Sequence, residues 1–517
     1  MNPSIVLGVI VLYFLMVFGV SWWTTRRHDR DTETFYRGDR KSPWWVVAIA
    51  MIGTSISGVT YVSVPGMVEA KQMSYIQMVL GFVCGYFAVA YILLPLYYRL
   101  GLSSIYVYLE QRYGRYAHKT GASFFLLSKY LGCAVRMYLT AVVLQLVLFD
   151  QLGVPFALSV ACIMLVVWLY SFRGGVKTLV WTDLLQTLCL LAAMIGFVIC
   201  ISSAMGLNFT GLCHTISQSP MSRVWFFDDA NDTRFFWKQF LGGMFTTIAM
   251  TGLDQDMMQK NLSCKSLKEA QKNMVSYGFG FLPVNLIFLS LGILLYMYAR
   301  EVGVDRSGDE LFPYLATGIN PTTGQPFLPL IVSLLFVLGL VAAAFSSAGS
   351  AVTALTTAIM VDFLRKNPSE EGSRGLSGTK GSRGLRGLRG LKGSRGSRGL
   401  RGSIEGQRFW VHLINSILMG FMIYLFHLLA SGSVINAVYV VASYTYGPLI
   451  GLFFFGMFTR FEVKDGWWIP AICIASPLLC FVLDQSSEAW FNGYKIGYEM
   501  LLINGALTAL GLFMAKK

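Results

Sequence analysis

Long apolar stretches recur along the whole chain, separated by short polar segments. An apolar run of about 20 residues can cross a lipid bilayer as a helix. The pattern therefore predicts an all-α integral membrane protein with 13 transmembrane helices. The predicted spans are residues 3–23, 44–64, 74–98, 121–149, 155–171, 178–203, 236–252, 273–299, 327–363, 409–430, 433–457, 466–484 and 498–514. The first run starts Met-Asn-Pro-Ser without a basic segment or cleavage site, so we expect an anchor rather than a removed signal peptide.

The distribution of basic residues predicts the orientation of these helices. With the N terminus outside, 32 of the 41 Lys and Arg residues lie in cytoplasmic segments and seven lie outside. Lys260 is assigned to a cytoplasmic loop, whereas Lys129 and Arg136 fall within spans. Cytoplasmic loops carry the excess of positive charge. We therefore expect a multi-pass protein of the cell (inner) membrane, with its N terminus outside and its C terminus in the cytoplasm.

Composition excludes several classes of protein. The 517 residues are 55% hydrophobic and only 13% charged, whereas a soluble protein carries about 25% charged residues. The net charge of +14 does not indicate nucleic-acid binding, because nine basic residues and no acid lie in one segment, 373–402. No obligate protein partner is evident in the sequence either.

That basic segment repeats the triplet x-x-Gly ten times, from Ser373 to Gly402. It contains no proline, so a collagen-like triple helix is not expected. We expect a disordered basic insertion over residues 366–407. Docking on anionic lipid headgroups is the alternative.

Two predicted spans carry hydroxyl groups at bilayer depth, where polar groups are costly and indicate function. Glycine and proline interrupt residues 51–66, which frees backbone carbonyls that can hold an ion. In the second span, hydroxyl groups share one helical face, which suits a hard cation such as sodium. Close packing of helices through small residues is the alternative for both. The interrupting residues are Gly53, Gly58, Pro65 and Gly66, and the shared face comprises Ala343, Ser346, Ser347 and Ser350.

Two charged residues also fall within spans. Asp183 lies near the cytoplasmic end of its span, where it is either solvated or adds negative charge to a cation path. Arg136 lies mid-span, where its guanidinium could grip a substrate carboxylate or pair with a helix carbonyl or an acid. The sequence contains no GxxxxGK[ST], HExxH or GxSxG pattern. An enzyme or an ATP-driven pump is therefore not expected, which leaves a gradient-driven transporter, a passive pore or a sensor.

Four motifs lie along most of the chain. They are Arg99–Tyr113, Gly174-Gly175 with Trp181-Thr-Asp-Leu-Leu-Gln186, Thr251-Gly-Leu-Asp-Gln-Asp-Met-Met-Gln-Lys260 with Lys265–Ala270, and Tyr446–Leu452. Together they resemble motifs of the sodium/solute symporter family, which includes sodium-coupled sugar, proline and sialic acid carriers. The resemblance implies a LeuT-type fold with two inverted five-helix repeats. These repeats would be residues 44–203 and 236–457, flanked by helices within 1–23 and 458–517.

The resemblance also implies sodium sites. A first site would use backbone carbonyls and two hydroxyls, from Gly53, Ile56, Ala343, Ser346 and Ser347. Some members bind a second sodium, and here Ser55, Asp183, Ser346 and Ser350 match that site. Position 349 is glycine where those members have serine, which argues against a second ion.

For the solute, the resemblance to sialic acid carriers implies Ser57, Thr60, Gln77 and Arg136 as binding residues. The expected function is secondary active transport, in which inward sodium flux drives uptake of a carboxylate-bearing solute such as a sialic acid by alternating access. A neutral sugar as the solute and proton coupling remain alternatives. A sodium channel or leak and a membrane sensor without coupled transport are alternatives of another class.

Overall fold

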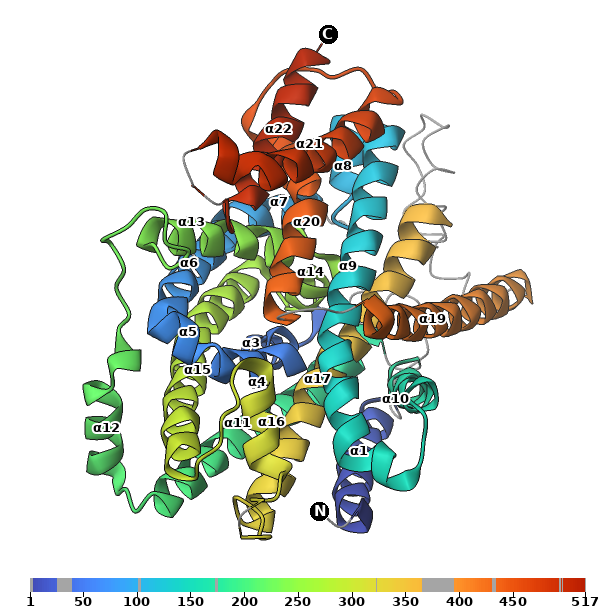
Figure 1. Ribbon diagram of the computed structural model, residues 1–517. Coiled ribbons are helices and arrows are strands. Elements are labelled where there is room, and N and C mark those ends of the chain that lie inside the picture. The colour runs from blue at the N-terminus through green and yellow to red at the C-terminus, as the bar shows by residue number, and fades with distance from the viewer. Residues whose placement is uncertain are drawn as a thin grey trace.

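The computed structural model describes residues 3–25, 40–100, 104–172, 175–321, 323–364, 395–429, 434–491, 494 and 496–516. Over these residues the chain is helical, with three isolated β-bridges and no named strand. The two termini lie at opposite ends of the molecule (Figure 1). An odd number of membrane crossings would produce this arrangement.

The first half of the bundle follows the flanking helix α1 (Pro3–Thr25) and opens with an interrupted helix. Its elements are α3 (Trp44–Ser55), α4 (Gly58–Gly66), α5 (Val68–Lys71), η2 (Gln72–Ser74), α6 (Tyr75–Ala88), η3 (Val89–Leu93), α7 (Leu94–Leu100), α8 (Val107–Arg112), α9 (Arg115–Leu144), η4 (Gln145–Phe149), η5 (Asp150–Leu152), α10 (Phe156–Ser171) and α11 (Gly175–Ala204).

The second half follows a connecting segment with α12 (Phe209–Gln218) and η6 (Pro220–Ser222), and it too opens with an interrupted helix. Its elements are α13 (Phe236–Thr247), η7 (Ile248–Gly252), α14 (Gln255–Leu262), α15 (Leu267–Glu301), η8 (Gly308–Glu310), α16 (Leu311–Thr317), α17 (Leu330–Ala358), η9 (Ile359–Phe363), α19 (Arg395–Leu429) and α20 (Val434–Phe458), followed by α21 (Trp468–Trp490) and α22 (Met500–Met514). The division into two repeats at 44–203 and 236–457 remains a prediction.

Helix α17 lies at the centre of the bundle. Every residue from Gly339 to Ala358 is buried. It packs against α11, α9, α3 and α4. Small residues along α17 let neighbouring backbones approach closely. Its serines are therefore enclosed by protein, which makes their hydroxyls available to buried partners only.

The described helices account for all the predicted apolar ranges, but not all are long enough to count as spans. Nine are long and apolar enough to cross a membrane, and the α3–α4 pair adds a tenth. Helices α10 and α22 are apolar but shorter. The predicted total of 13 spans therefore remains a prediction.

The basic x-x-Gly insertion is described only in its last part. Residues 365–394 lie outside the described residues. Residues 395–407, expected to be disordered, instead form the first turns of α19. Extending an existing helix costs less than nucleating a new one. The apolar part of α19 therefore explains why the helix continues into residues 395–407, although their glycines are weak helix formers.

Candidate functional site

The first core helix is interrupted inside the bundle. α3 ends at Ser55, Ile56 and Ser57 have extended backbone, and α4 begins at Gly58. The two helices are bent by 62°. The predicted interruption is thus confirmed, directly before Gly58, but Gly53 lies within α3, and Pro65 and Gly66 lie within α4. A Cβ at Gly53 would come within 1.9 Å of Thr187 Oγ1, so glycine there permits close approach of α11 rather than the break.

The serines of α17 face this interruption. α17 packs against both α3 and α4, and Ala343, Ser346 and Ser347 are buried. Ser347 Oγ donates to the carbonyl of Ala344 at 2.9 Å, and Ser346 Oγ donates to Asp183 Oδ1 at 3.0 Å. A hydroxyl that donates still has lone pairs for a cation. The last carbonyls of α3 lack partners within the helix, so the two elements together supply the oxygen types that sodium requires.

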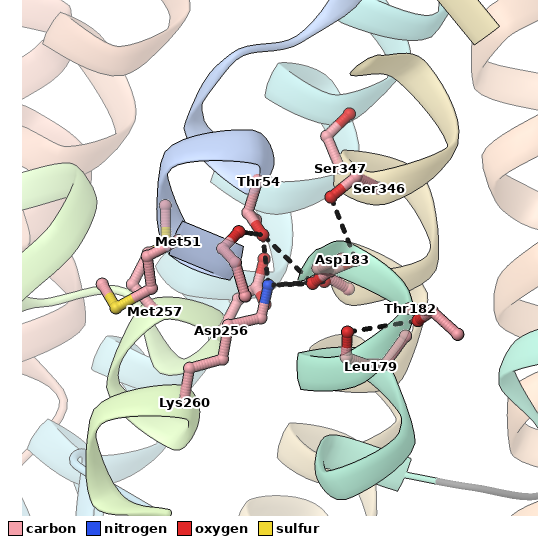
Figure 2. Close-up of polar contacts among 12 residues, drawn as sticks. Met51, Thr54, Leu179, Thr182, Asp183, Asp256, Met257, Lys260, Ser346 and Ser347 are labelled. Atoms are coloured by element: carbon pink, nitrogen blue, oxygen red, sulfur yellow. Dashed lines mark hydrogen bonds and ion pairs between the residues drawn. The ribbon is translucent and has the colours of Figure 1, made fainter. Parts of the chain in front are cut away.

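Asp183 on α11 is fully buried at the centre of a polar cluster (Figure 2). Its Oδ1 accepts from Ser346 Oγ at 3.0 Å, and its Oδ2 accepts from Ser350 Oγ at 3.0 Å. Thr54 Oγ1 of α3 donates to the same Oδ2 at 3.1 Å. The structure therefore brings together three of the four residues expected at a second cation site, and it adds Thr54.

Ser55, the fourth expected residue, makes a different contact. Its hydroxyl hydrogen-bonds the hydroxyl of Tyr277 on α15. Adjacent residues of a helix do not share a face, so Thr54 and Ser55 project toward different neighbours. Thr54, not Ser55, is the residue of α3 that reaches Asp183.

Lys260 completes the cluster, and this corrects its assignment to a cytoplasmic loop. Its ammonium Nζ lies 2.6 Å from Asp183 Oδ2 and donates to Ser350 Oγ at 2.7 Å and to Thr54 Oγ1. The side chain is only 1% exposed. The apolar run ends at residue 252, which suggested a loop beyond it, but the chain there forms α14 and returns Lys260 to the interior.

A second interruption therefore precedes Lys260. α13 passes into the wide turn η7, and α14 starts after Asp254. Asp254 caps α14, because its Oδ1 accepts from the backbone N–H of Asp256 at 2.8 Å. A glycine followed closely by an aspartate, as at 252–254, is the local signal of a helix end and a new start. That signal could have revealed this break.

A cavity lies between the two interrupted helices and α9. Ser57, Thr60 and Arg136 all line it, as predicted for a solute site. Lys129 of α9 also lines it and ion-pairs with two carboxylates of α14, at 2.8 Å to Asp256 and 3.1 Å to Asp254. Around the cavity and the Asp183 cluster, basic and acidic side chains balance: Lys129, Arg136 and Lys260 against Asp183, Asp254 and Asp256.

Arg136 differs from the two lysines. Among the described residues its guanidinium has no hydrogen-bond or ion-pair partner, although it faces the cavity. The carboxylates of Asp254 and Asp256 are engaged by Lys129. The pairing with an acid or a carbonyl, which was the alternative role for Arg136, is therefore not observed. Its fork of donors is free to bind an anion that enters the cavity.

Gln77 is fully buried but does not line this cavity. Its Nε2 donates to the carbonyl of Arg234 at 2.8 Å, and its Oε1 accepts from the N–H of Phe226 at 3.2 Å. Both partners belong to the segment before α13. There, hydrogen bonds from Arg234 lower the pKa of Asp232 below its ordinary value. The structure thus connects Gln77 to this segment and does not bring it to the other predicted solute-binding residues.

We expect Gln77→Ala to lower stability while leaving solute affinity unchanged. The substitution leaves the Phe226 N–H and the Arg234 carbonyl without their partner, at a cost of about 1–3 kcal/mol for each buried group. Thermal melting of the purified protein should show a lower midpoint, and uptake should show an unchanged KM. Gln151→Ala is the control, since Gln151 is exposed in η5. A raised KM with an unchanged melting midpoint would contradict this expectation and would support Gln77 as a solute-binding residue.

Comparison with known proteins identifies relatives that align with about two thirds of this chain. The sodium-coupled monocarboxylate transporter 2 of Homo sapiens is 26% identical over 357 residues, which cover 67% of this chain and 55% of that protein. The sodium/sialic acid symporter NanT of Aliivibrio fischeri is 24% identical over 364 residues, covering 67% of this chain and 68% of that protein. The chain spans about half the length of the monocarboxylate transporters that it matches.

Solved structures establish the fold. The structure of a Na+-coupled sialic acid symporter in a substrate-bound outward-open state superposes with a TM-score of 0.76, at 17% identity and over 99% of both chains. Mhp1, a nucleobase-cation-symport-1 family transporter, gives a TM-score of 0.55 at 12% identity, over 92% of this chain and 93% of its own. At such identities the likeness concerns the fold alone. The model of the sodium:solute symporter family matches residues 35–371, more than half of the sequence, and the chain belongs to that family.

Proposed function

We propose that this protein is a secondary active transporter that couples inward sodium flux to uptake of a small carboxylate-bearing solute. The observation that carries the solute class is Arg136, a cavity-lining guanidinium without a protein partner among the described residues. Arg136 is partly buried, and removing a cation from water without supplying an anion is costly. A solute carboxylate would supply the missing partner through two parallel charge-assisted hydrogen bonds.

The proposed sodium site lies at the junction of the interrupted helix and α17. Carbonyls of Gly53, Ile56 and Ala343 and hydroxyls of Ser346 and Ser347 would hold the ion. The extended backbone at Ile56 and the burial of both serines support this assignment. Neutral oxygen ligands suit a hard monovalent cation. Because these ligands carry no charge, the bound sodium ion would add one positive charge to the bundle.

The two sites share the interrupted segment, and this would couple them. Ile56 and Ser57 form the break, and Gly53 lies in the turn of α3 before it. Ser57 and Thr60, which lies in the first turn of α4, line the cavity. Sodium that fixes the break against α17 would also order the hydroxyls that meet the solute. Coupling of this kind is reciprocal and typically amounts to about 1–3 kcal/mol. Rocking of the helices would then open the site toward the cytoplasm, where low sodium favours release.

Relatives named as monocarboxylate and sialic acid carriers support the carboxylate class. A monocarboxylate needs Arg136 and little else that is polar. A sialic acid also needs hydroxyl partners, which Ser57 and Thr60 supply. The proposal therefore covers both solutes, and the neutral sugar is the second candidate. We further propose an orientation in the cell membrane with the N terminus outside.

Uptake into proteoliposomes tests the proposal. We expect a short monocarboxylate or a sialic acid to accumulate under an inward sodium gradient but not under a potassium gradient. The methyl ester of the same solute lacks the negative charge and should not accumulate.

Each alternative predicts a different result in the same vesicles. Equal uptake of acid and ester, or of a neutral sugar, would favour the sugar alternative. Sodium entry without any solute would indicate a leak. Uptake in sodium-free buffer at acidic external pH would indicate proton coupling.

A further inference from the structure

The ammonium of Lys260 occupies an oxygen shell of the kind that binds a metal cation. Asp183 Oδ2 lies 2.6 Å from Nζ, Ser350 Oγ lies 2.7 Å away, and Thr54 Oγ1 also accepts from it. These oxygens come from α11, α17 and α3, whereas the lysine comes from α14. Figure 2 shows the nitrogen between Thr54 and Asp183. One carboxylate and two hydroxyls from three helices thus surround a single positive charge.

The charges of the shell leave no room for a second cation. Lys260 and Asp183 are 1% and 0% exposed, so neither charge is relieved by water. The neighbouring carboxylate of Asp256 is already paired with Lys129 at 2.8 Å. A sodium ion bound to Asp183 Oδ2 would lie within a few ångströms of the ammonium, and like charges at that distance repel strongly in a buried site. Asp183 therefore holds either the ammonium or an ion.

The packing around Gly349 removes a further oxygen ligand. A Cβ at this position would come within 2.1 Å of Tyr170 Oη. The Tyr170 side chain is buried, and its hydroxyl donates to the carbonyl of Phe345 on the same turn of α17. A serine at 349 would clash with that ring. The space next to Ser346 and Ser350 is filled by an aromatic side chain instead of a hydroxyl group.

We propose that Lys260 is a tethered cation that takes the place of a second sodium ion, so that the protein binds one sodium per transport cycle. The proposal rests on the proposed sodium-coupled function. Ser346 connects the two sites, because it donates to Asp183 and is also a proposed ligand of the transported ion. Lys260 thereby keeps Asp183 in place beside the transported sodium, and it ties the second interrupted helix to the first.

Equilibrium binding of ²²Na⁺ to the purified full-length protein tests this assignment. We expect one sodium per wild-type chain. Lys260→Gln removes the positive charge but keeps Asp183, Ser346, Ser350 and Thr54, so a second equivalent should bind. The double variant Lys260→Gln with Asp183→Asn removes the carboxylate as well and should return to one. Lys238→Gln, a buried lysine of α13 outside the cluster, is the matched control and should stay at one.

The outcomes separate this inference from the proposed function. Two equivalents in the wild type would overturn the tethered-cation role and leave sodium coupling intact. No bound sodium would overturn the proposed function itself. One equivalent in a Lys260→Gln variant that melts cooperatively would show that the lysine does not exclude an ion. The wild-type count still decides between one and two ions if that variant fails to fold.

Discussion

Replacing Ser346 and Ser347 together by alanine is expected to abolish sodium-dependent uptake while the protein still reaches the membrane. The change removes both hydroxyl ligands of the proposed sodium site. Hydrogen bonds to charged groups contribute about 1.5–3 kcal/mol each, so losing two comparable contacts to an ion costs at least about 3 kcal/mol. That corresponds to a rise of roughly 100-fold in the sodium concentration for half-maximal uptake.

The two single variants separate the loss of an ion ligand from the loss of the hydrogen bond to Asp183. Ser347 donates only within its own helix, to Ala344, so Ser347→Ala reports on the ion directly. Ser346→Ala also removes a hydrogen bond to Asp183 and should have the larger effect. Ser333→Ala is the control on the same helix, because Ser333 lies near the start of α17 and its hydroxyl donates to the carbonyl of Ala316 on α16. An unchanged sodium dependence in the double variant, measured with normal surface expression, would refute the site.

Replacing Arg136 by alanine is expected to reduce carboxylate uptake by a factor of 100 or more. The variant loses two charge-assisted hydrogen bonds to the solute, again about 3 kcal/mol in total. Lysine at this position keeps the charge but not the planar fork, so Arg136→Lys should retain part of the uptake with a raised KM. Initial rates over a range of solute concentrations, at saturating sodium, measure both variants.

The control for charge alone is Arg306→Ala. Arg306 forms an exposed ion pair with Glu310, and such pairs contribute little to stability. It should leave uptake unchanged. If Arg136→Ala transported the carboxylate normally, the guanidinium would have a structural role and a neutral solute would become the better candidate.

The sequence predicted the parts of the site that depend on helix periodicity and on the chemistry of single spans. Hydropathy located the helices, glycine and hydroxyl content marked the interrupted one, and spacing put Ser346 and Ser350 on one face. The structure brings that face to Asp183. Arg136 and Thr60 could be expected in the interior because polar side chains at that depth need a partner or a cavity.

Lys260 and Gln77 could not be placed in this way. Hydropathy averaged along the sequence predicts a loop for a lysine just beyond an apolar run. Lys260 is buried only because α14 returns into the bundle. Gln77 lies inside an apolar span, which suggests a polar contact, but its partner is backbone more than 140 residues later in sequence. Both depend on tertiary packing, which local patterns do not contain.

The balance of three basic and three acidic side chains around the cavity and the Asp183 cluster has an electrical consequence. With one sodium ion and one monovalent anion bound, the loaded carrier would have the same net charge as the empty one. Moving one elementary charge across a membrane involves about 2.3 kcal/mol per 100 mV, and neither reorientation step would then carry a net charge. Membrane voltage would not drive accumulation in such a carrier. The sodium concentration ratio alone would set the limit.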